Sequence, residues 1–201
     1  MLDPLMRRVI DPPLERAGRW LAHSGLSANA VTWLGFGFGL AAMAALAVQL
    51  YALALALILV NRAADGLDGA LARQRGPTDL GGYLDIVLDF LFYSGVVFGF
   101  ALGRPEDALA AAFLIFSFVG TGSSFLAYAI LAAKRGLTTD IRGRKSLYYL
   151  GGLTEGSETI ALLVAICLFP GAFTWLATAF GLLCWLTTAG RITAAIQTFR
   201  E

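Results

Sequence analysis

Apolar residues fill most of this chain in blocks separated by short polar or charged segments. Each block is close to the roughly 20 residues that an α-helix needs to cross the hydrocarbon core of a bilayer. The pattern predicts six transmembrane helices, over residues 28–49, 50–73, 81–102, 106–134, 155–170 and 172–192. Aspartates interrupt the second and third blocks, so neither is purely apolar. We therefore expect an all-α membrane protein whose six-helix domain occupies residues 28–201.

The first 27 residues differ from the rest because they are charged and contain two adjacent prolines. Leu14, Ala17, Trp20 and Leu21 nevertheless share one stripe at helical spacing, with charged residues elsewhere. A helix with this pattern is suited to lie in the membrane interface. Residues 1–27 are therefore predicted to form an interfacial amphipathic segment, and a flexible cytosolic leader is the alternative.

Composition supports a membrane protein and gives no indication of a nucleic-acid partner. Hydrophobic residues make up 58% of the chain and charged residues 14%, the mean hydropathy is +0.71 and the net charge is +1. Soluble proteins contain more charge and less apolar sequence. Cys167 and Cys184 fall inside predicted helices, where small apolar packing is expected in place of a disulfide framework.

Basic residues fall almost entirely on one side of the predicted membrane. They precede the first helix, follow the sixth, and lie in the loops that join helices two to three and four to five. On the opposite side the only basic loop residue is Arg104, while Arg62 lies within the second helix. Because Lys and Arg are enriched in cytoplasmic loops, we expect both termini in the cytoplasm and the protein in the inner (cytoplasmic) membrane.

Four aspartates, Asp65, Asp68, Asp85 and Asp89, lie in the apolar part of the chain. A charge near the bilayer centre costs roughly 2.5–3.5 kcal/mol even on the lowest scale. Helical periodicity places the first two on one face of the second helix and the last two on one face of the third. Neighbouring carboxylates need a cation, and their oxygens suit Mg²⁺ or Mn²⁺. Two such ions can hold the oxygens of a phosphoryl group during displacement.

The residues beside these aspartates suit a phosphorylated ligand. Gly69 and Gly81 have no side chain, so a bulky ligand can approach the backbone there. Arg73 offers a fork of donors that matches phosphate oxygens. Together with a metal at the depth of the bilayer, these features indicate phosphoryl transfer to or from a lipid.

This arrangement resembles the signature of the CDP-alcohol phosphatidyltransferase family. The matching positions are Asp65, Asp68, Gly69, Ala72, Arg73, Gly81, Asp85 and Asp89. The segment between the arginine and the next glycine is one residue shorter than is usual in the family. Gly82 would restore the length but spoil the spacing to Asp85, so we take Gly81 as the motif glycine. The resemblance implies six helices, a site that faces the cytoplasm and a homodimer.

The resemblance also implies a role for each motif residue. Asp65 and Asp85 would each bridge two metal ions, with Asp68 on the first ion and Asp89 on the second. Asp89 would also be the catalytic general base that acts on the acceptor hydroxyl. Contacts to the CDP group are implied for Asn29, Thr32, Gly69, Arg73, Thr78 and Gly81.

Other polar residues near the cytoplasmic side have two interpretations each. Glu155 and Glu158 either stabilise a helix N-terminus through the helix dipole or read the acceptor alcohol. The basic residues within 134–145 either bind anionic lipid headgroups or bind an anionic acceptor. Arg191 either reaches the aspartate pocket or extends its charge to the interface.

The expected activity is transfer of a phosphatidyl (substituted phosphoryl) group from a CDP-linked lipid to a small alcohol, with release of CMP in phospholipid synthesis. CDP-diacylglycerol is the expected donor, and a CDP-amino-alcohol with diacylglycerol as acceptor stays open. No residue decides the acceptor. The alternatives are a membrane prenyltransferase with an Asp-bound diphosphate, a small transporter with an acidic ion site, and an inactive family member.

Overall fold

The computed structural model of the chain describes residues 3–137 and 152–200, and in these ranges every regular element is a helix. The long helices are α1 (Asp3–Ala22), α2 (Ala28–Ala47), α3 (Tyr51–Arg75), α4 (Asp79–Gly103), α5 (Ala108–Lys134), α6 (Gly156–Leu168) and α7 (Phe173–Phe199). Two 3-10 turns, η1 (Pro105–Asp107) and η2 (Pro170–Ala172), precede α5 and α7. The all-α prediction is confirmed, and one long helix lies in each of the six apolar blocks.

Four helical segments are long and apolar enough to cross a membrane, by length and composition alone. They are Ala28–Ala47, Asp79–Gly103, Pro105–Lys134 and Pro170–Phe199. With 25 residues, α3 is long enough, but charged side chains interrupt its second half. With 13 residues, α6 is shorter than the roughly 20 residues of an ordinary span. Membrane crossing by α3 and α6 therefore stays a prediction, and with it the count of six spans.

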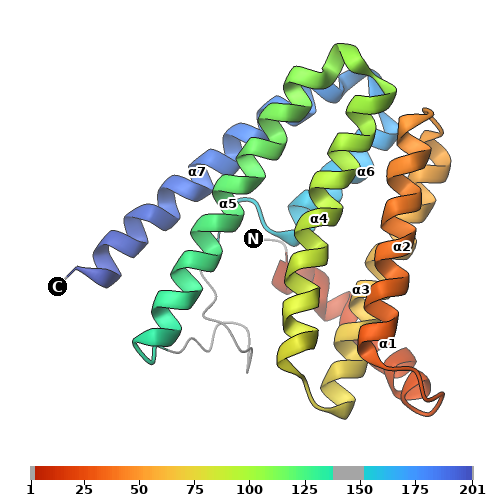
Figure 1. Cartoon of the computed structure of the whole chain (residues 1–201), viewed down its shortest axis with the longest axis vertical. Helices are drawn as coiled ribbons and strands as arrows, with labels where there is room; N and C mark the ends of the chain where they lie inside the picture. The colour runs from red at the N-terminus through yellow and green to blue at the C-terminus, as the bar shows by residue number, and fades with distance from the viewer. Residues whose placement is uncertain (1–2, 138–151, 201) are drawn as a thin grey trace.

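The helices pack in two groups that meet at one end. α2 packs along both α3 and α4, and α5 packs along α7 (Figure 1). α4 and α5 are joined through η1 at the top of Figure 1 and diverge below it. One hydrophobic core contains side chains from all six helices α2–α7, including a stacked pair, Phe100 and Phe173, with ring centroids 4.1 Å apart. Cys167 and Cys184 are both in this core as free thiols.

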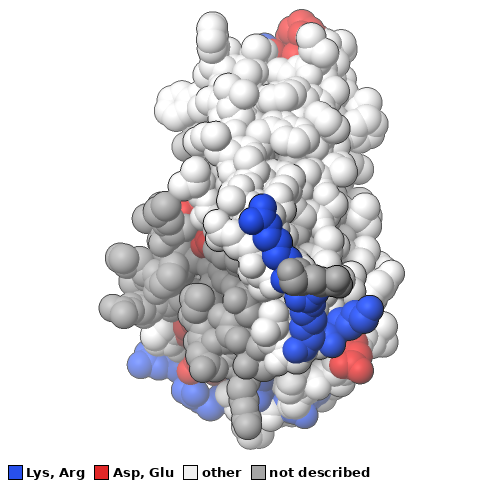
Figure 2. All heavy atoms as spheres, turned by 90° about the vertical axis from the view of Figure 1, so that its left-hand side faces the viewer, with Lys and Arg blue, Asp and Glu red and all other residues white. Residues whose placement is uncertain are grey.

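Large apolar side chains are also exposed on the outside of the helices. Leu109 is 85% exposed and Trp175 is 80% exposed. Soluble monomers rarely carry extended apolar surface of this kind. Figure 2 shows that Lys and Arg gather in the lower half of the face it presents, whereas the upper half is mostly uncharged. The surface therefore suits a bilayer, and the orientation of the chain in the membrane stays a prediction.

Small residues bring the helices that carry the aspartates close together. A Cβ added at Gly35 of α2 would lie 2.9 Å from the Cβ of Ala64 in α3. A Cβ added at Gly99 of α4 would lie 2.5 Å from the carbonyl oxygen of Met43 in α2. Small residues at such positions let helix backbones approach. α2 can therefore contact α3 and α4 at the same time.

The N-terminal helix α1 crosses beneath α3 in Figure 1 and runs through both prolines. A Cβ added at Gly18 would lie 2.9 Å from the Cβ of Ala70, and Leu14 packs against Gly66. α1 thus supports α3 on a face next to the one that bears Asp65 and Asp68. The helix expected over this segment is present, while its place in the membrane interface stays a prediction.

Replacing Gly99 with alanine should lower the midpoint of thermal unfolding of the detergent-purified protein. The new methyl group would meet the Met43 carbonyl oxygen, and overpacking of this kind costs about 1–3 kcal/mol. Gly37→Ala in α2 is the matched control, because no described atom lies within 4 Å of the Cβ it would add. That change should leave the midpoint unchanged or raise it, since alanine favours a helix over glycine. A Gly99→Ala protein as stable as the control would contradict the close contact of α2 and α4.

Candidate metal and active site

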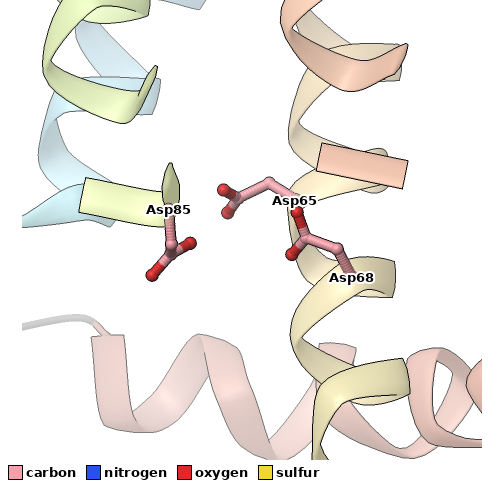
Figure 3. Close-up of side chains that lie close together, drawn as sticks. All are labelled: Asp65, Asp68 and Asp85. Atoms are coloured by element: carbon pink, nitrogen blue, oxygen red, sulfur yellow. The ribbon is translucent and has the colours of Figure 1, made fainter. Parts of the chain in front are cut away.

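Three of the four predicted aspartates converge on one point. Asp65 and Asp68 extend from α3 and Asp85 from α4, and their carboxylates point toward one another (Figure 3). One oxygen from each lies within 4.8 Å of the other two. Three oxygens at this separation can bind the same ion at the usual metal–oxygen distances of about 2.0–2.6 Å. Asp68 is buried, Asp65 half-buried and Asp85 exposed, so the cluster opens outward past Asp85.

One oxygen in this cluster indicates that a cation fits there. Asp68 Oδ2 is buried and has no hydrogen-bond partner among the described residues. A buried polar atom without a partner is costly, and a buried carboxylate oxygen more so. A bound divalent cation would compensate that cost. The residues present therefore fit a metal ion, with Asp65, Asp68 and Asp85 as its ligands.

Asp89 lies in the same pocket but is bound by an arginine. Arg62 Nη2 donates a hydrogen bond to Asp89 Oδ1 at 2.9 Å, and Arg62 Nη1 lies 3.7 Å from Asp65 Oδ2. Both aspartates, with Asp85 and Thr32, line a cavity of about 10 Å³, which is the size of a single water or ion. Asp89 is therefore close enough to belong to the site, although its carboxylate is outside the three-oxygen cluster.

Arg62 lies in the site, although the sequence pattern gives it no role beyond a charge within the second predicted helix. Three residues before Asp65, it lies about 60° from Asp65 on the same helical face. Helical spacing alone could have placed it beside the cluster.

Two other residues fix Arg62 in place. Its Nε donates to Asn61 Oδ1 at 2.8 Å, and Asn61 Nδ2 donates to the Gly35 carbonyl oxygen at 2.7 Å. The guanidinium carbon lies 4.3 Å from the centre of the Phe92 ring, in a cation–π contact. The close approach of α2 to α3 at Gly35 thus orients the arginine that binds Asp89.

Three of the predicted nucleotide contacts meet at the start of α4. Thr78 caps this helix, and its hydroxyl accepts a hydrogen bond from the Gly81 amide at 3.0 Å. A Cβ at Gly81 would lie 3.1 Å from Thr78 Oγ1 and 3.2 Å from Asn29 Oδ1. At Gly82 the added Cβ would have no described atom within 4 Å. This crowding favours Gly81 over Gly82 as the glycine that the motif requires.

The remaining predicted nucleotide contacts adjoin the aspartates. Thr32 lines the aspartate cavity, and its hydroxyl donates to the Ala28 carbonyl oxygen at 3.0 Å. A Cβ at Gly69 would lie 3.5 Å from Arg73 Nη1, so the exposed Arg73 side chain folds back over Gly69. The Arg73 guanidinium therefore lies beside the backbone of Gly69, the residue that follows Asp68.

For some of the residues that had two interpretations, the structure decides between them. Glu155 and Glu158 form a capping box at the start of α6, which confirms the helix-terminus interpretation. Arg191 is buried between α5 and α7, where Nη1 donates to the Thr121 carbonyl oxygen at 2.8 Å. It does not extend to the surface. Of the basic stretch, Lys134 ends α5, while residues 142, 144 and 145 lie outside the described residues.

An apolar groove adjoins the aspartate cavity. Its volume is about 320 Å³, and its lining includes Met43 of α2, Leu91 and Phe98 of α4, and Ile115 of α5. Phe36 lines both the groove and the aspartate cavity. Charged and apolar binding surfaces are therefore continuous on one side of α2 and α4.

The family model of the CDP-alcohol phosphatidyltransferases matches residues 26–192, which include every predicted site residue. This chain belongs to the CDP-alcohol phosphatidyltransferase family, whose members are transferases of substituted phosphate groups.

Two relatives in sequence and two solved structures are similar to this chain. The inner membrane protein YnjF of Escherichia coli (strain K12) is 52% identical over 202 residues, which cover 100% of this chain and 98% of the relative. The archaetidylinositol phosphate synthase of Pyrococcus horikoshii is 34% identical over 99 residues, 49% of this chain and 53% of the relative.

The solved structures are of Mycobacterium tuberculosis phosphatidylinositol phosphate synthase (PgsA1). The crystal structure with CDP-DAG bound has a TM-score of 0.73 at 18% identity, over 91% of this chain and 93% of that one. The complex with manganese and citrate has a TM-score of 0.72 at 20% identity, over 90% and 87%. At these identities the comparison shows that the fold is shared.

Substituting Asp68 with asparagine should remove most of the stabilisation that Mn²⁺ gives the purified protein. A ligand at 100 times its dissociation constant stabilises a protein by about 2.7 kcal/mol. Thermal unfolding with EDTA and with Mn²⁺ measures the difference. Asp79→Asn is the matched control, because Asp79 is an exposed acid on the first turn of α4, outside the cluster. An Asp68→Asn protein with the full Mn²⁺ shift would contradict the metal site.

Proposed function

We propose that this protein transfers a phosphatidyl or other substituted phosphoryl group from a CDP-linked lipid to the hydroxyl of a small alcohol, and releases CMP. CDP-diacylglycerol is the proposed donor. The observation that carries the proposal is the convergence of Asp65, Asp68 and Asp85 at the end of the bundle where Asn29, Thr78 and Gly81 also meet. A structural relative with CDP-DAG bound supports this donor.

The shape of the site favours a donor with a charged part and a hydrocarbon part. Arg73, beside Gly69, suits the phosphate oxygens of the nucleotide. The apolar groove adjoins the aspartate cavity at Phe36, so acyl chains could extend along α2 and α4. A water-soluble nucleotide sugar would leave that groove without use.

In the proposed reaction, an oxygen of the acceptor alcohol forms a bond to the β-phosphorus of the donor. The bond between this phosphorus and the bridging oxygen of CMP breaks, and CMP leaves. Asp89 accepts the proton of the acceptor hydroxyl as general base. Two Mg²⁺ or Mn²⁺ ions would be held by Asp65, Asp68, Asp85 and Asp89, and would supply neutralisation of the phosphate charge. The relative solved with manganese supports this choice of metal.

The proposed setting is the inner membrane, with the site on the cytoplasmic side and the protein as a homodimer. The E. coli relative is named an inner membrane protein, which supports the location. Arg73 and Arg75 in the last turn of α3, the helix that carries Asp65 and Asp68, support its orientation through the positive-inside rule. We keep residues 1–27 as an interfacial segment and residues 28–201 as the catalytic domain.

The deciding experiment incubates purified protein with CDP-diacylglycerol, Mn²⁺ and a panel of alcohols, including glycerol phosphate, serine and inositol phosphate. Mass spectrometry should find CMP together with one new phospholipid, whose mass identifies the acceptor. A second assay, with CDP-amino-alcohols as donors and diacylglycerol as acceptor, tests the other donor that the sequence leaves open. Release of pyrophosphate from a prenyl diphosphate, or ion flux in liposomes without use of CDP-lipid, would overturn the proposal.

Asp89→Asn should reduce CMP release by a factor of roughly 10²–10⁴, the contribution typical of a general base. The amide keeps the shape of the side chain but cannot accept the proton. Donor binding and the folded state should persist, measured by equilibrium binding of CDP-diacylglycerol and by thermal unfolding. Asp79→Asn serves as the control for charge removal from α4. Wild-type turnover by Asp89→Asn would remove the base assignment.

Gly81→Ala should raise the KM for the CDP-lipid several-fold with a smaller effect on kcat. Its methyl group would displace Thr78 Oγ1 and Asn29 Oδ1, which lie 3.1 Å and 3.2 Å from the new Cβ. Gly82→Ala is the control on the adjacent residue, because its methyl group meets open space among the described residues. Equal KM values for the two variants would argue against nucleotide contacts at Gly81.

A further inference from the structure

Arg62 is a cation placed directly among the carboxylates. Its side chain is 10% exposed and contacts Asp89 at 2.9 Å and Asp65 at 3.7 Å. The family signature described above begins at Asp65 and assigns Arg62 no role. Carboxylates this close to one another repel, and a buried charge needs a counter-charge. Arg62 supplies that counter-charge from within the chain.

The arginine is held more firmly than a surface ion pair would be. Each guanidinium nitrogen donates a hydrogen bond: Nε to Asn61, Nη1 to the Tyr93 hydroxyl at 3.0 Å, and Nη2 to Asp89. The Phe92 ring covers one face of the group. Arg62 therefore has a fixed position, and Asp89 is the partner with freedom to change.

Asp89 is paired with Arg62 and is outside the cluster formed by the other three carboxylates. Asp85 and Asp89 are one helical turn apart on α4, which places them on the same face. The oxygens within 4.8 Å of one another nevertheless come from Asp65, Asp68 and Asp85. Asp89 Oδ1 is instead taken by Arg62 Nη2.

We propose that Arg62 and a divalent cation compete for Asp89. Arg62 is the counter-cation that the chain itself supplies, and a divalent cation that recruits Asp89 must first break the ion pair between Asp89 and Arg62. Arg62 is thus a positioning residue that sets the affinity of the cation site built on Asp89. This inference rests on the metal binding in the proposed function.

If Arg62 and the cation compete, replacing Arg62 should strengthen Mn²⁺ binding, whereas general damage to the structure would weaken it. Arg62→Gln should bind Mn²⁺ more tightly at the weaker of its sites, because Asp89 is released and a repelling charge is removed. We expect the Mn²⁺ dissociation constant at that site to fall roughly tenfold, the size of one charged hydrogen bond that the ion no longer has to break. Without metal, the same variant should unfold at a lower temperature than wild type.

The test measures free Mn²⁺ by electron paramagnetic resonance during titration of the purified full-length protein, and thermal unfolding in EDTA. Wild type is compared with Arg62→Gln, Arg62→Lys, Asp89→Asn and the double variant Arg62→Gln/Asp89→Asn. Arg62→Lys keeps the charge but not the fork of donors, and should change Mn²⁺ binding less than Arg62→Gln. In the Asp89→Asn background, Arg62→Gln should no longer tighten Mn²⁺ binding, because the contested ligand is gone.

A second variant covers the case in which Arg62→Gln does not fold without metal. Tyr93→Phe removes the hydroxyl that accepts from Nη1 and should loosen Arg62 with the charge retained. It should tighten Mn²⁺ binding by a smaller factor than Arg62→Gln.

Three results would overturn the inference. They are unchanged or weaker Mn²⁺ binding in folded Arg62→Gln and Tyr93→Phe, tighter binding that persists without Asp89, and a wild-type protein that binds no Mn²⁺. The proposed activity is judged separately, by CMP release from CDP-diacylglycerol. A protein that shows the competition but releases no CMP with any acceptor would retain the Arg62 inference and lose the proposed function.

Discussion

The mutual repulsion of carboxylates is the constraint on which the functional end of this protein depends. Four aspartates bring their carboxyl groups to one end of a mostly apolar bundle, and Arg62 supplies a positive charge among them. The buried Asp68 oxygen without a partner among the described residues marks where compensation is still needed. A divalent cation would meet that need, and its remaining positive charge would in turn attract the phosphates of the proposed donor. The site is therefore built to be completed by what it binds.

The rest of the bundle holds this arrangement together from three sides. α2 stands between α3 and α4 because Gly35 and Gly99 let it approach both. α1 supports the neighbouring face of α3 through Gly18. The hydrophobic core fastens the helices toward the other end, where the Phe100 and Phe173 rings stack. Apolar packing at that end of the bundle thus stabilises the fold against the repulsion between carboxylates at the other end.

The position of the charged cluster next to an apolar groove suits chemistry at the surface of a bilayer. A lipid donor has to present its diphosphate to metal and arginine while its acyl chains stay in hydrocarbon. The shared wall at Phe36 allows both requirements to be met by one face of α2 and α4. The fold is shared with a solved structure at 18% identity, so it tolerates different side chains at most positions.

Local sequence determined the helical blocks and the faces on which Asp65, Asp68 and Asp85 lie, because helical periodicity is a property of neighbouring residues. For Glu155 and Glu158 the sequence left two interpretations, and the structure selected the capping role. Only the tertiary structure decided that Asp89 pairs with Arg62 across two helices and that Asn29 meets Gly81. Such contacts join residues far apart in the chain, and they depend on helix separations that small residues set. Spacing within one helix carries no information about that distance.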